Sequence, residues 1–196
     1  MGESNHGTPW VPILLRSAVA AAFGILTVFW QQPGEGVLGM AGGLYLLLTA
    51  VVLWPMAALA GGLGQERIRS LVLLEAALYA LAGVAVLALR SAEVFCVAAG
   101  LALAVGGAVE LYLWKTTRAA FLPARDWLIT GVVGVGTALI LLAVQLMGLG
   151  AHAMLGVTGG SAIIIAVALA TSGLGARWDA RQPAGTGSAT TARQKP

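Results

Sequence analysis

Charged residues are scarce in this sequence. Lys, Arg, Asp and Glu make up 10% of the 196 residues, whereas a soluble domain carries about 25%. So few charges cannot solvate a globular surface, and the mean hydropathy of +0.89 points the same way. A soluble fold is excluded, and the net charge of +3 is no sign of nucleic-acid binding because the basic residues flank apolar spans.

Cysteine and histidine are also nearly absent. Cys96 is the single cysteine, which excludes an intramolecular disulfide and a cysteine-based metal site. His6 and His152 are the two histidines, and we expect them on opposite sides of the membrane, where they cannot share a metal or haem. The chain has no phosphate-binding loop motif, no zinc-protease motif and no acidic metal cluster. We therefore predict no enzymatic activity, no catalytic residue, no metal and no cofactor.

Long apolar runs account for most of the chain. Each is about 20 residues long, enough to cross the hydrocarbon core of a bilayer. The sequence predicts an all-α polytopic membrane protein with six transmembrane helices, and the Trp54-Pro55 step should kink or end the second. Residues 1–10 and 175–196 are predicted to be disordered. The expected helices are 11–30, 37–62, 71–89, 94–114, 127–147 and 152–174.

The basic residues are distributed unevenly over the expected loops. Arg90 is the only basic residue expected on one side of the membrane, and ten are expected on the other. The positive-inside rule identifies the side with more basic residues as cytoplasmic. Both termini fall on that side, and the bias toward Ala, Gly, Val and Arg favours a bacterial source. We predict a multi-pass protein of the bacterial cytoplasmic membrane, embedded in the lipid bilayer. The basic residues on the cytoplasmic side are Arg16, Arg67, Arg69, Lys115, Arg118, Arg125, Arg177, Arg181, Arg193 and Lys195.

Similar segments recur along the chain with a period of roughly 55 to 60 residues. They open the first, third and fifth expected helices, so the chain is predicted to consist of three repeated helical hairpins. The segments are Leu14-Leu15-Arg16 followed by Phe23-Gly24-Ile25, Leu73-Leu74-Glu75 followed by Ala82-Gly83-Val84, and Leu128-Ile129-Thr130 followed by Thr137-Ala138-Leu139.

Some of these residues also resemble a known family. Leu14-Leu15-Arg16 with Phe23-Gly24-Ile25, the Pro33-Gly34 turn after Phe29-Trp30, and Gly43-x-Tyr45 are similar to the acid-resistance membrane proteins of HdeD type. The resemblance covers about residues 13–177. It implies a six-helix bacterial inner-membrane protein built from repeated hairpins and linked to acid stress. It implies no catalytic or binding residues.

Three ionisable residues fall inside the expected helices: Arg16, Glu75 and Glu110. A charge within a membrane helix is costly to insert and indicates a functional site. All three are expected at one level near the cytoplasmic face. They could form a titratable site that binds a proton or senses cytoplasmic pH, with Tyr79 one turn along from Glu75. They could also form a structural clamp whose side chains reach toward water, or Glu110 could pair with Lys115 or Arg118 near the end of its helix.

Pairs of glycines occur in the second and sixth expected helices. Gly39 and Gly43 form one small-x3-small motif, and Gly156 and Gly160 form another. This spacing places both glycines on one helix face and lets neighbouring backbones approach closely. We predict that these faces pack within the chain. The alternative is a contact between two copies of the protein.

The sequence thus leaves three functional hypotheses. The first is an integral membrane protein without enzymatic activity, with a structural or acid-stress-related role as in HdeD-like proteins. The second is a small proton-linked transporter or channel that uses Arg16, Glu75 and Glu110. The third is an accessory subunit of a larger membrane complex.

Overall fold

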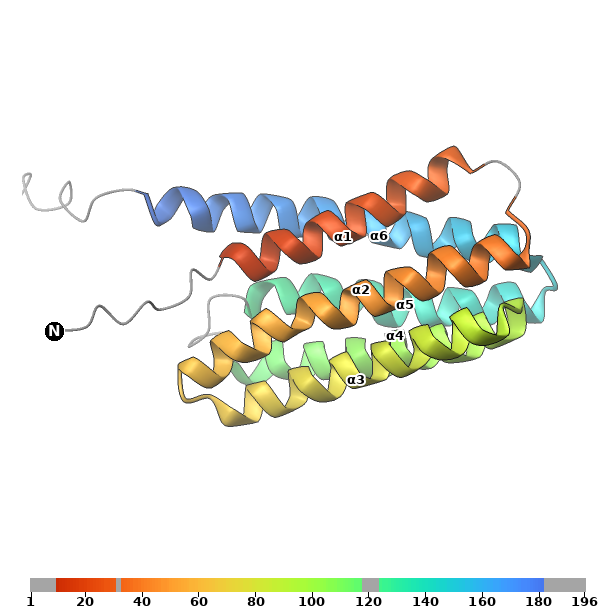
Figure 1. Cartoon of the computed structure of the whole chain (residues 1–196). Coiled ribbons are helices and arrows are strands. Elements are labelled where there is room, and N and C mark those ends of the chain that lie inside the picture. The colour runs from red at the N-terminus through yellow and green to blue at the C-terminus, as the bar shows by residue number, and fades with distance from the viewer. Residues whose placement is uncertain (1–9, 31–32, 118–123, 182–196) are drawn as a thin grey trace, which may run out of the picture.

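The computed structural model describes residues 10–30, 33–117 and 124–181. Six α-helices account for nearly all of this part of the chain (Figure 1). The segments predicted to be disordered lie mostly outside these residues. The helices are α1 (Trp10–Phe29), α2 (Glu35–Gly62), α3 (Glu66–Leu89), α4 (Ala92–Thr117), α5 (Ala124–Leu146) and α6 (Gly150–Asp179).

All six helices are long and apolar enough to cross a membrane. The shortest, α1, has 20 residues and the longest, α6, has 30. A span of about 20 residues matches the hydrocarbon core of a bilayer. The prediction of an all-helical chain with six apolar helices of spanning length is confirmed.

Consecutive helices run in opposite directions and form one bundle (Figure 1). The most extensive interfaces join α2 to α3, α4 to α5, and α1 to α6. The interfaces between α1 and α2, α3 and α4, and α5 and α6 are smaller. Direct contacts among α2, α4 and α6 close the middle of the bundle. The even-numbered helices are therefore the inner ones, and the first and last helices lie side by side.

Two helices extend well beyond their predicted bounds. α3 begins at Glu66 rather than at residue 71, because Ile68 is buried and Ser70 Oγ donates a hydrogen bond to the Glu66 carbonyl at 2.9 Å. α6 continues to Asp179 rather than ending at 174. The Arg177 guanidinium lies 5.3 Å from the centre of the Trp10 ring, so a cation–π contact with α1 holds this extra turn. The other predicted bounds lie within one turn of those observed.

Pro55 does not end α2, which continues to Gly62. Proline removes one backbone donor and disturbs the preceding turn. The residues around it compensate by packing, since Leu53, Met56 and Ala57 are all buried in the bundle. Tertiary packing therefore carries the helix through a position where the local sequence favours a break.

Glycines meet at each of the three large interfaces. A Cβ atom added to Gly107 would lie 2.8 Å from the Gly131 carbonyl oxygen, and one added to Gly131 would lie 2.8 Å from the Gly107 carbonyl oxygen. Backbones this close leave no room for a side chain. The pairs are Gly43 and Gly83 between α2 and α3, Gly107 and Gly131 between α4 and α5, and Gly24 and Gly159 between α1 and α6.

We expect Gly107→Ala to destabilise the protein by about 1–3 kcal/mol, because overpacking of a close interface forces the backbones apart. Gly100→Ala is the matched control on the same helix, since a Cβ there would meet nothing within 4 Å. It should be neutral or stabilising by up to about 1 kcal/mol, because alanine favours helix over glycine. Melting temperatures of both variants in one detergent would test this, and equal shifts would contradict the close packing of α4 on α5.

Gly39 and Gly43 both face α3 or the turn that follows it. A Cβ on Gly39 would lie 2.8 Å from the Arg90 Cα, and a Cβ on Gly43 would lie 3.1 Å from the Gly83 carbonyl oxygen. Arg90 has a φ of 48°, in the left-handed region, and ends α3 there. Gly39 thus gives the α3–α4 turn room to pack against α2.

Gly156 and Gly160 do not pack within the chain. Both are exposed, and a Cβ at either would meet nothing within 4 Å. The contact with α1 is made instead by Gly159, against Gly24 and Thr27. At 3.6 residues per turn, one position along a helix is a rotation of about 100°. The prediction that Gly156 and Gly160 pack within the chain is therefore wrong for the described residues. The glycine of α6 that packs against α1 is Gly159.

Candidate functional site

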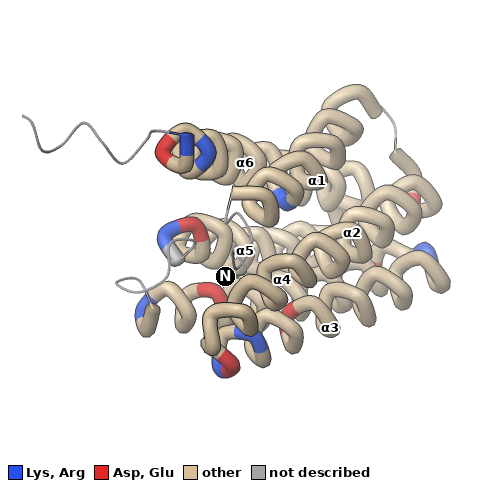
Figure 2. Tube along the Cα trace, turned by 60° about the vertical axis from the view of Figure 1, so that its left-hand side comes forward, with Lys and Arg blue, Asp and Glu red and all other residues tan. Residues whose placement is uncertain are grey.

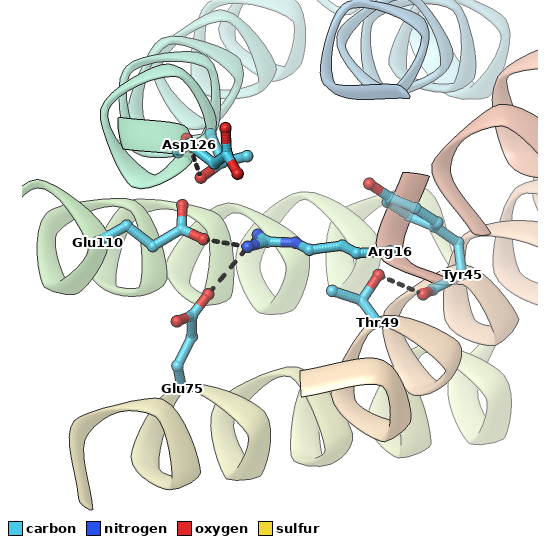
Figure 3. Close-up of polar contacts among 7 residues, drawn as sticks. Arg16, Tyr45, Thr49, Glu75, Glu110 and Asp126 are labelled. Carbon is cyan, nitrogen blue, oxygen red and sulfur yellow. Dashed lines mark hydrogen bonds and ion pairs between the residues drawn. The ribbon is translucent and has the colours of Figure 1, made fainter. Parts of the chain in front are cut away.

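Three charged side chains meet inside the bundle: Arg16 from α1, Glu75 from α3 and Glu110 from α4 (Figure 3). Arg16 Nη1 lies 2.5 Å from Glu110 Oε1, and Arg16 Nη2 lies 3.8 Å from Glu75 Oε1. The exposed fractions of the Arg16, Glu75 and Glu110 side chains are 11%, 0% and 1%. The structure thus brings together the three residues that the sequence singled out, and we call them the charge cluster.

The alternating direction of the helices explains why these residues meet. Arg16 and Glu75 lie in the first halves of α1 and α3, while Glu110 lies near the end of α4, which runs the opposite way. All three therefore fall toward the same end of the bundle. That end also carries most of the Lys and Arg residues drawn in Figure 2, whereas the far end has few.

The two carboxylates differ in their contacts with Arg16. Glu110 forms the close ion pair, whereas the distance from Arg16 to Glu75 is beyond hydrogen-bonding range. Neither oxygen of Glu75 receives a hydrogen bond from any residue in the described part of the chain. Buried carboxylate oxygens are nearly always hydrogen-bonded. Glu110 Oε1 also lacks a hydrogen bond among the described residues, but it has the close ion pair with Arg16. Glu75 is therefore the less satisfied of the two carboxylates.

Aromatic residues surround the charge cluster. Tyr79 lies one turn along α3 from Glu75 and is buried. A Cβ on Gly106 would lie 3.1 Å from Tyr79 Cε2 and 3.3 Å from Glu75 Cγ, so this glycine of α4 gives both side chains room. On α2, the Tyr45 ring stacks on Phe23 with centroids 4.2 Å apart. Tyr45 of α2 and the buried Tyr79 of α3 thus lie beside the cluster.

A small polar cavity adjoins the charge cluster. Its volume is about 10 Å³, and its polar lining comes from Arg16, Tyr45, Thr49, Tyr79 and Thr130. A cavity of this size accommodates roughly one water molecule. This cavity, which the described residues form beside Arg16, is too small for an organic substrate.

Asp126 is a third buried carboxylate that the sequence analysis did not single out. It lies in the first turn of α5, is 6% exposed, and its Oδ2 has no hydrogen-bond partner among the described residues. Figure 3 shows its carboxylate on the same side of Arg16 as that of Glu110. The predicted fifth helix began at Trp127, which assigned Asp126 to a loop. An acidic residue just before a helix is a common first-turn residue, and that signal could have identified it.

A larger hollow of about 340 Å³ lies between α1 and α2, away from the charges. Apart from Tyr45, its lining is formed by apolar and tryptophan side chains, and no charged residue contributes to it. Its residues include Phe23, Leu26, Trp30 and Met40. This hollow offers mainly apolar contact.

In residues 10–30, 33–117 and 124–181, no three His, Cys, Asp or Glu side chains are grouped in a way that could hold a metal ion. Cys96 is a free, buried thiol in α4 whose Sγ lies 3.5 Å from the Leu141 carbonyl oxygen. A weak thiol donor of this kind contributes to packing between α4 and α5.

Comparison with known proteins shows no protein-family model, no curated protein sequence and no solved structure that matches this chain. The resemblance to the HdeD type therefore stays a prediction from the sequence motifs.

Proposed function

We propose that the chain is an integral protein of the bacterial cytoplasmic membrane, with six transmembrane helices and both termini in the cytoplasm. Six apolar helices of spanning length support this, as does the gathering of Lys and Arg at one end of the bundle (Figure 2). A basic end of a membrane bundle faces the cytoplasm. The three-hairpin repeat is part of the proposal, and the regular alternation of outer odd and inner even helices supports it.

The function that we propose is a structural or acid-stress-related role without enzymatic activity, as in HdeD-type proteins. The observation that carries it is the enclosed charge cluster. Arg16, Glu75 and Glu110 face one another from three helices, and the adjoining cavity has a volume of only about 10 Å³. A cavity of that size among the described residues does not accommodate a substrate, whereas the ion pairs of the cluster can hold α1, α3 and α4 together.

Cysteine labelling would test the orientation, with Glu66→Cys and Glu93→Cys as a matched pair in a Cys96→Ser background. Both glutamates are exposed. Glu66 lies in the first turn of α3 and Glu93 in the first turn of α4, and these two antiparallel helices begin at opposite ends of the bundle. A membrane-impermeant maleimide should label Glu93→Cys in intact cells. It should label Glu66→Cys only after the cells are permeabilised. The reverse pattern would place the termini outside the cytoplasm.

Survival of an acid-sensitive bacterial strain would test the role in stress. Cells that express the chain should survive a low-pH challenge better than cells with an empty vector. Arg16→Ala should remove this protection because the charge cluster is broken, whereas Arg69→Ala should retain it because Arg69 is exposed. Survival equal to that with the empty vector, at confirmed expression, would reject an acid-stress role.

A proton-linked transporter is the second candidate, favoured by the excess of buried carboxylates over the single guanidinium. Against it, the cluster lies toward one end of the bundle, whereas transporter sites usually lie near the bilayer midplane. Purified protein in liposomes under a proton gradient would decide between the candidates. Flux in the wild type that is lost in Glu75→Gln would favour the transporter, and no flux in either would count against it.

A further inference from the structure

We infer that Glu75 and Glu110 together hold one exchangeable proton, which makes the charge cluster a proton-binding site inside the bundle. The inference goes beyond the proposed role. It concerns what the folded protein binds at neutral pH, and it holds whether or not the protein protects cells from acid or moves protons across the membrane.

The charge balance of the cluster is the first argument. Two carboxylates face one guanidinium, and all three side chains are largely removed from solvent. If both carboxylates were ionised, one negative charge would stay buried without a partner, which is strongly unfavourable in a low-dielectric interior. One proton bound to one carboxylate gives a neutral carboxylic acid and leaves a single ion pair.

The geometry assigns different roles to the two carboxyl groups. Glu110 is the ionised partner, because its Oε1 lies 2.5 Å from Arg16 Nη1. Glu75 carries the proton, because Arg16 lies 3.8 Å away and neither Glu75 oxygen receives a hydrogen bond from the described residues. Both carboxyl groups face the same guanidinium, Glu110 at 2.5 Å and Glu75 at 3.8 Å. A proton on Glu75 leaves Glu110 as the ionised partner of Arg16, so the pair holds one proton and one negative charge.

A proton fits this site better than a metal cation. The Arg16 guanidinium contacts the same oxygens that a cation would need and would repel it. Alkaline-earth ions take about six or more oxygen ligands, whereas the adjoining cavity of about 10 Å³ has room for one water molecule.

The groups that face the pair come from several helices. Arg16 of α1 supplies the positive charge, and the phenols of Tyr45 on α2 and Tyr79 on α3 lie beside it. Asp126 of α5 is a further buried carboxylate. It faces Ser172 of α6 and follows the exposed Arg125. Because the ion pairs of the cluster join Arg16 to Glu75 and Glu110 and not to Asp126, Asp126 serves as the internal control.

Infrared spectroscopy of the full chain in detergent would detect the proton directly. A protonated carboxyl group gives a carbonyl band that an ionised one lacks, and the band shifts in heavy water. The wild type should show this band at neutral pH. Glu75→Gln and Glu110→Gln should each lose it, because either change leaves one carboxylate paired with one guanidinium. Asp126→Asn and the exposed Glu93→Gln should keep it.

Three outcomes would overturn the inference. They are the absence of the band in the wild type, its retention in both glutamine variants, and its loss in Asp126→Asn alone.

Arg16→Gln provides a test in the opposite direction: with no guanidinium, both carboxyls should be protonated and the band area should rise about twofold. Size-exclusion chromatography and circular dichroism of each variant would show that it is folded. If one glutamine variant does not fold, the wild-type and Arg16→Gln spectra still decide.

Discussion

Arg16→Ala should destabilise the bundle by about 3–5 kcal/mol at neutral pH, because removing one partner of a buried ion pair forces the remaining carboxylate to stay charged without a partner or to take up a proton, and both are unfavourable. For a chain of this size, that loss corresponds to a fall in melting temperature on the order of 10 °C. The 11% exposure of the Arg16 side chain means that solvent can compensate little of the loss. Thermal unfolding in one detergent would measure it.

Arg69→Ala is the matched control for this change. Arg69 pairs with Glu66 at 3.3 Å, but both side chains are about half or more exposed. An exposed pair of this kind contributes about 0–1 kcal/mol, so the melting temperature should hardly change. Equal melting temperatures for the wild type and Arg16→Ala would mean that the charge cluster does not clamp α1, α3 and α4.

The Arg16→Ala variant should also depend on pH in a defined direction. Its folded state would hold the two buried carboxyls as neutral acids, whereas the unfolded chain releases those protons at neutral pH. Because the folded state then binds more protons than the unfolded state, stability falls as the pH rises. The difference from the wild type should therefore be largest at alkaline pH and smaller in acid.

Replacing all three cluster residues by methionine should be far less harmful than replacing Arg16 alone. Well-packed apolar side chains in place of a buried ion triad are often neutral or stabilising by about 1–4 kcal/mol, because no charge is left to desolvate. We expect the triple variant Arg16→Met, Glu75→Met, Glu110→Met to melt at or above the wild-type temperature. A triple variant less stable than Arg16→Ala would show that the three side chains pack in a way that methionine cannot reproduce.

This triple variant also separates the two roles of the cluster. If the cluster serves only to hold the helices together, a stable triple variant should still protect cells from acid. If protection requires the bound proton, the triple variant should fold normally and yet fail in the survival test. The single-alanine variant cannot make this distinction, because it loses stability and chemistry together.

The apolar runs were sufficient to predict the number of helices, because each run matches the length needed to cross a bilayer. Their ends were harder to predict. Residues 66–70 are mostly polar and were expected to form a loop, but Ile68 is buried and draws the first turn of α3 onto the bundle. Arg177 likewise extends α6 through its contact with Trp10. These contacts cross between helices, and no pattern within one segment reveals them.

The level of the charge cluster was predictable for a simple geometric reason. In an up-and-down bundle, positions near the start of one helix and near the end of the next share a level, so the common level of Arg16, Glu75 and Glu110 could be predicted from their numbers. That their side chains meet depends on how α1, α3 and α4 pack, and only the structure shows it. Asp126 was missed because its inclusion depended on where α5 begins.

The glycine of α6 was misassigned for another reason. α6 has glycines on two faces, Gly156 and Gly160 on one and Gly159 on the other. The spacing of the glycines does not show which face packs against a neighbouring helix. Only the position of α1, with Gly24 and Thr27 against Gly159, makes the choice.

The pairing of the first helix with the last has a consequence for biosynthesis. α1 is synthesised before α6, but its largest interface is with α6. Until α6 is inserted, α1 has its smaller interface with α2 and the ion pairs of Arg16 with α3 and α4. The α6-facing residues of α1 still lack their partners. They include Gly24 and Ser17, and the Ser17 hydroxyl donates to the Ala166 carbonyl at 2.8 Å in the complete bundle. Closure of the bundle is thus a late, non-local step. A chain that stops before residue 150 should leave α1 exposed to lipid and to membrane proteases.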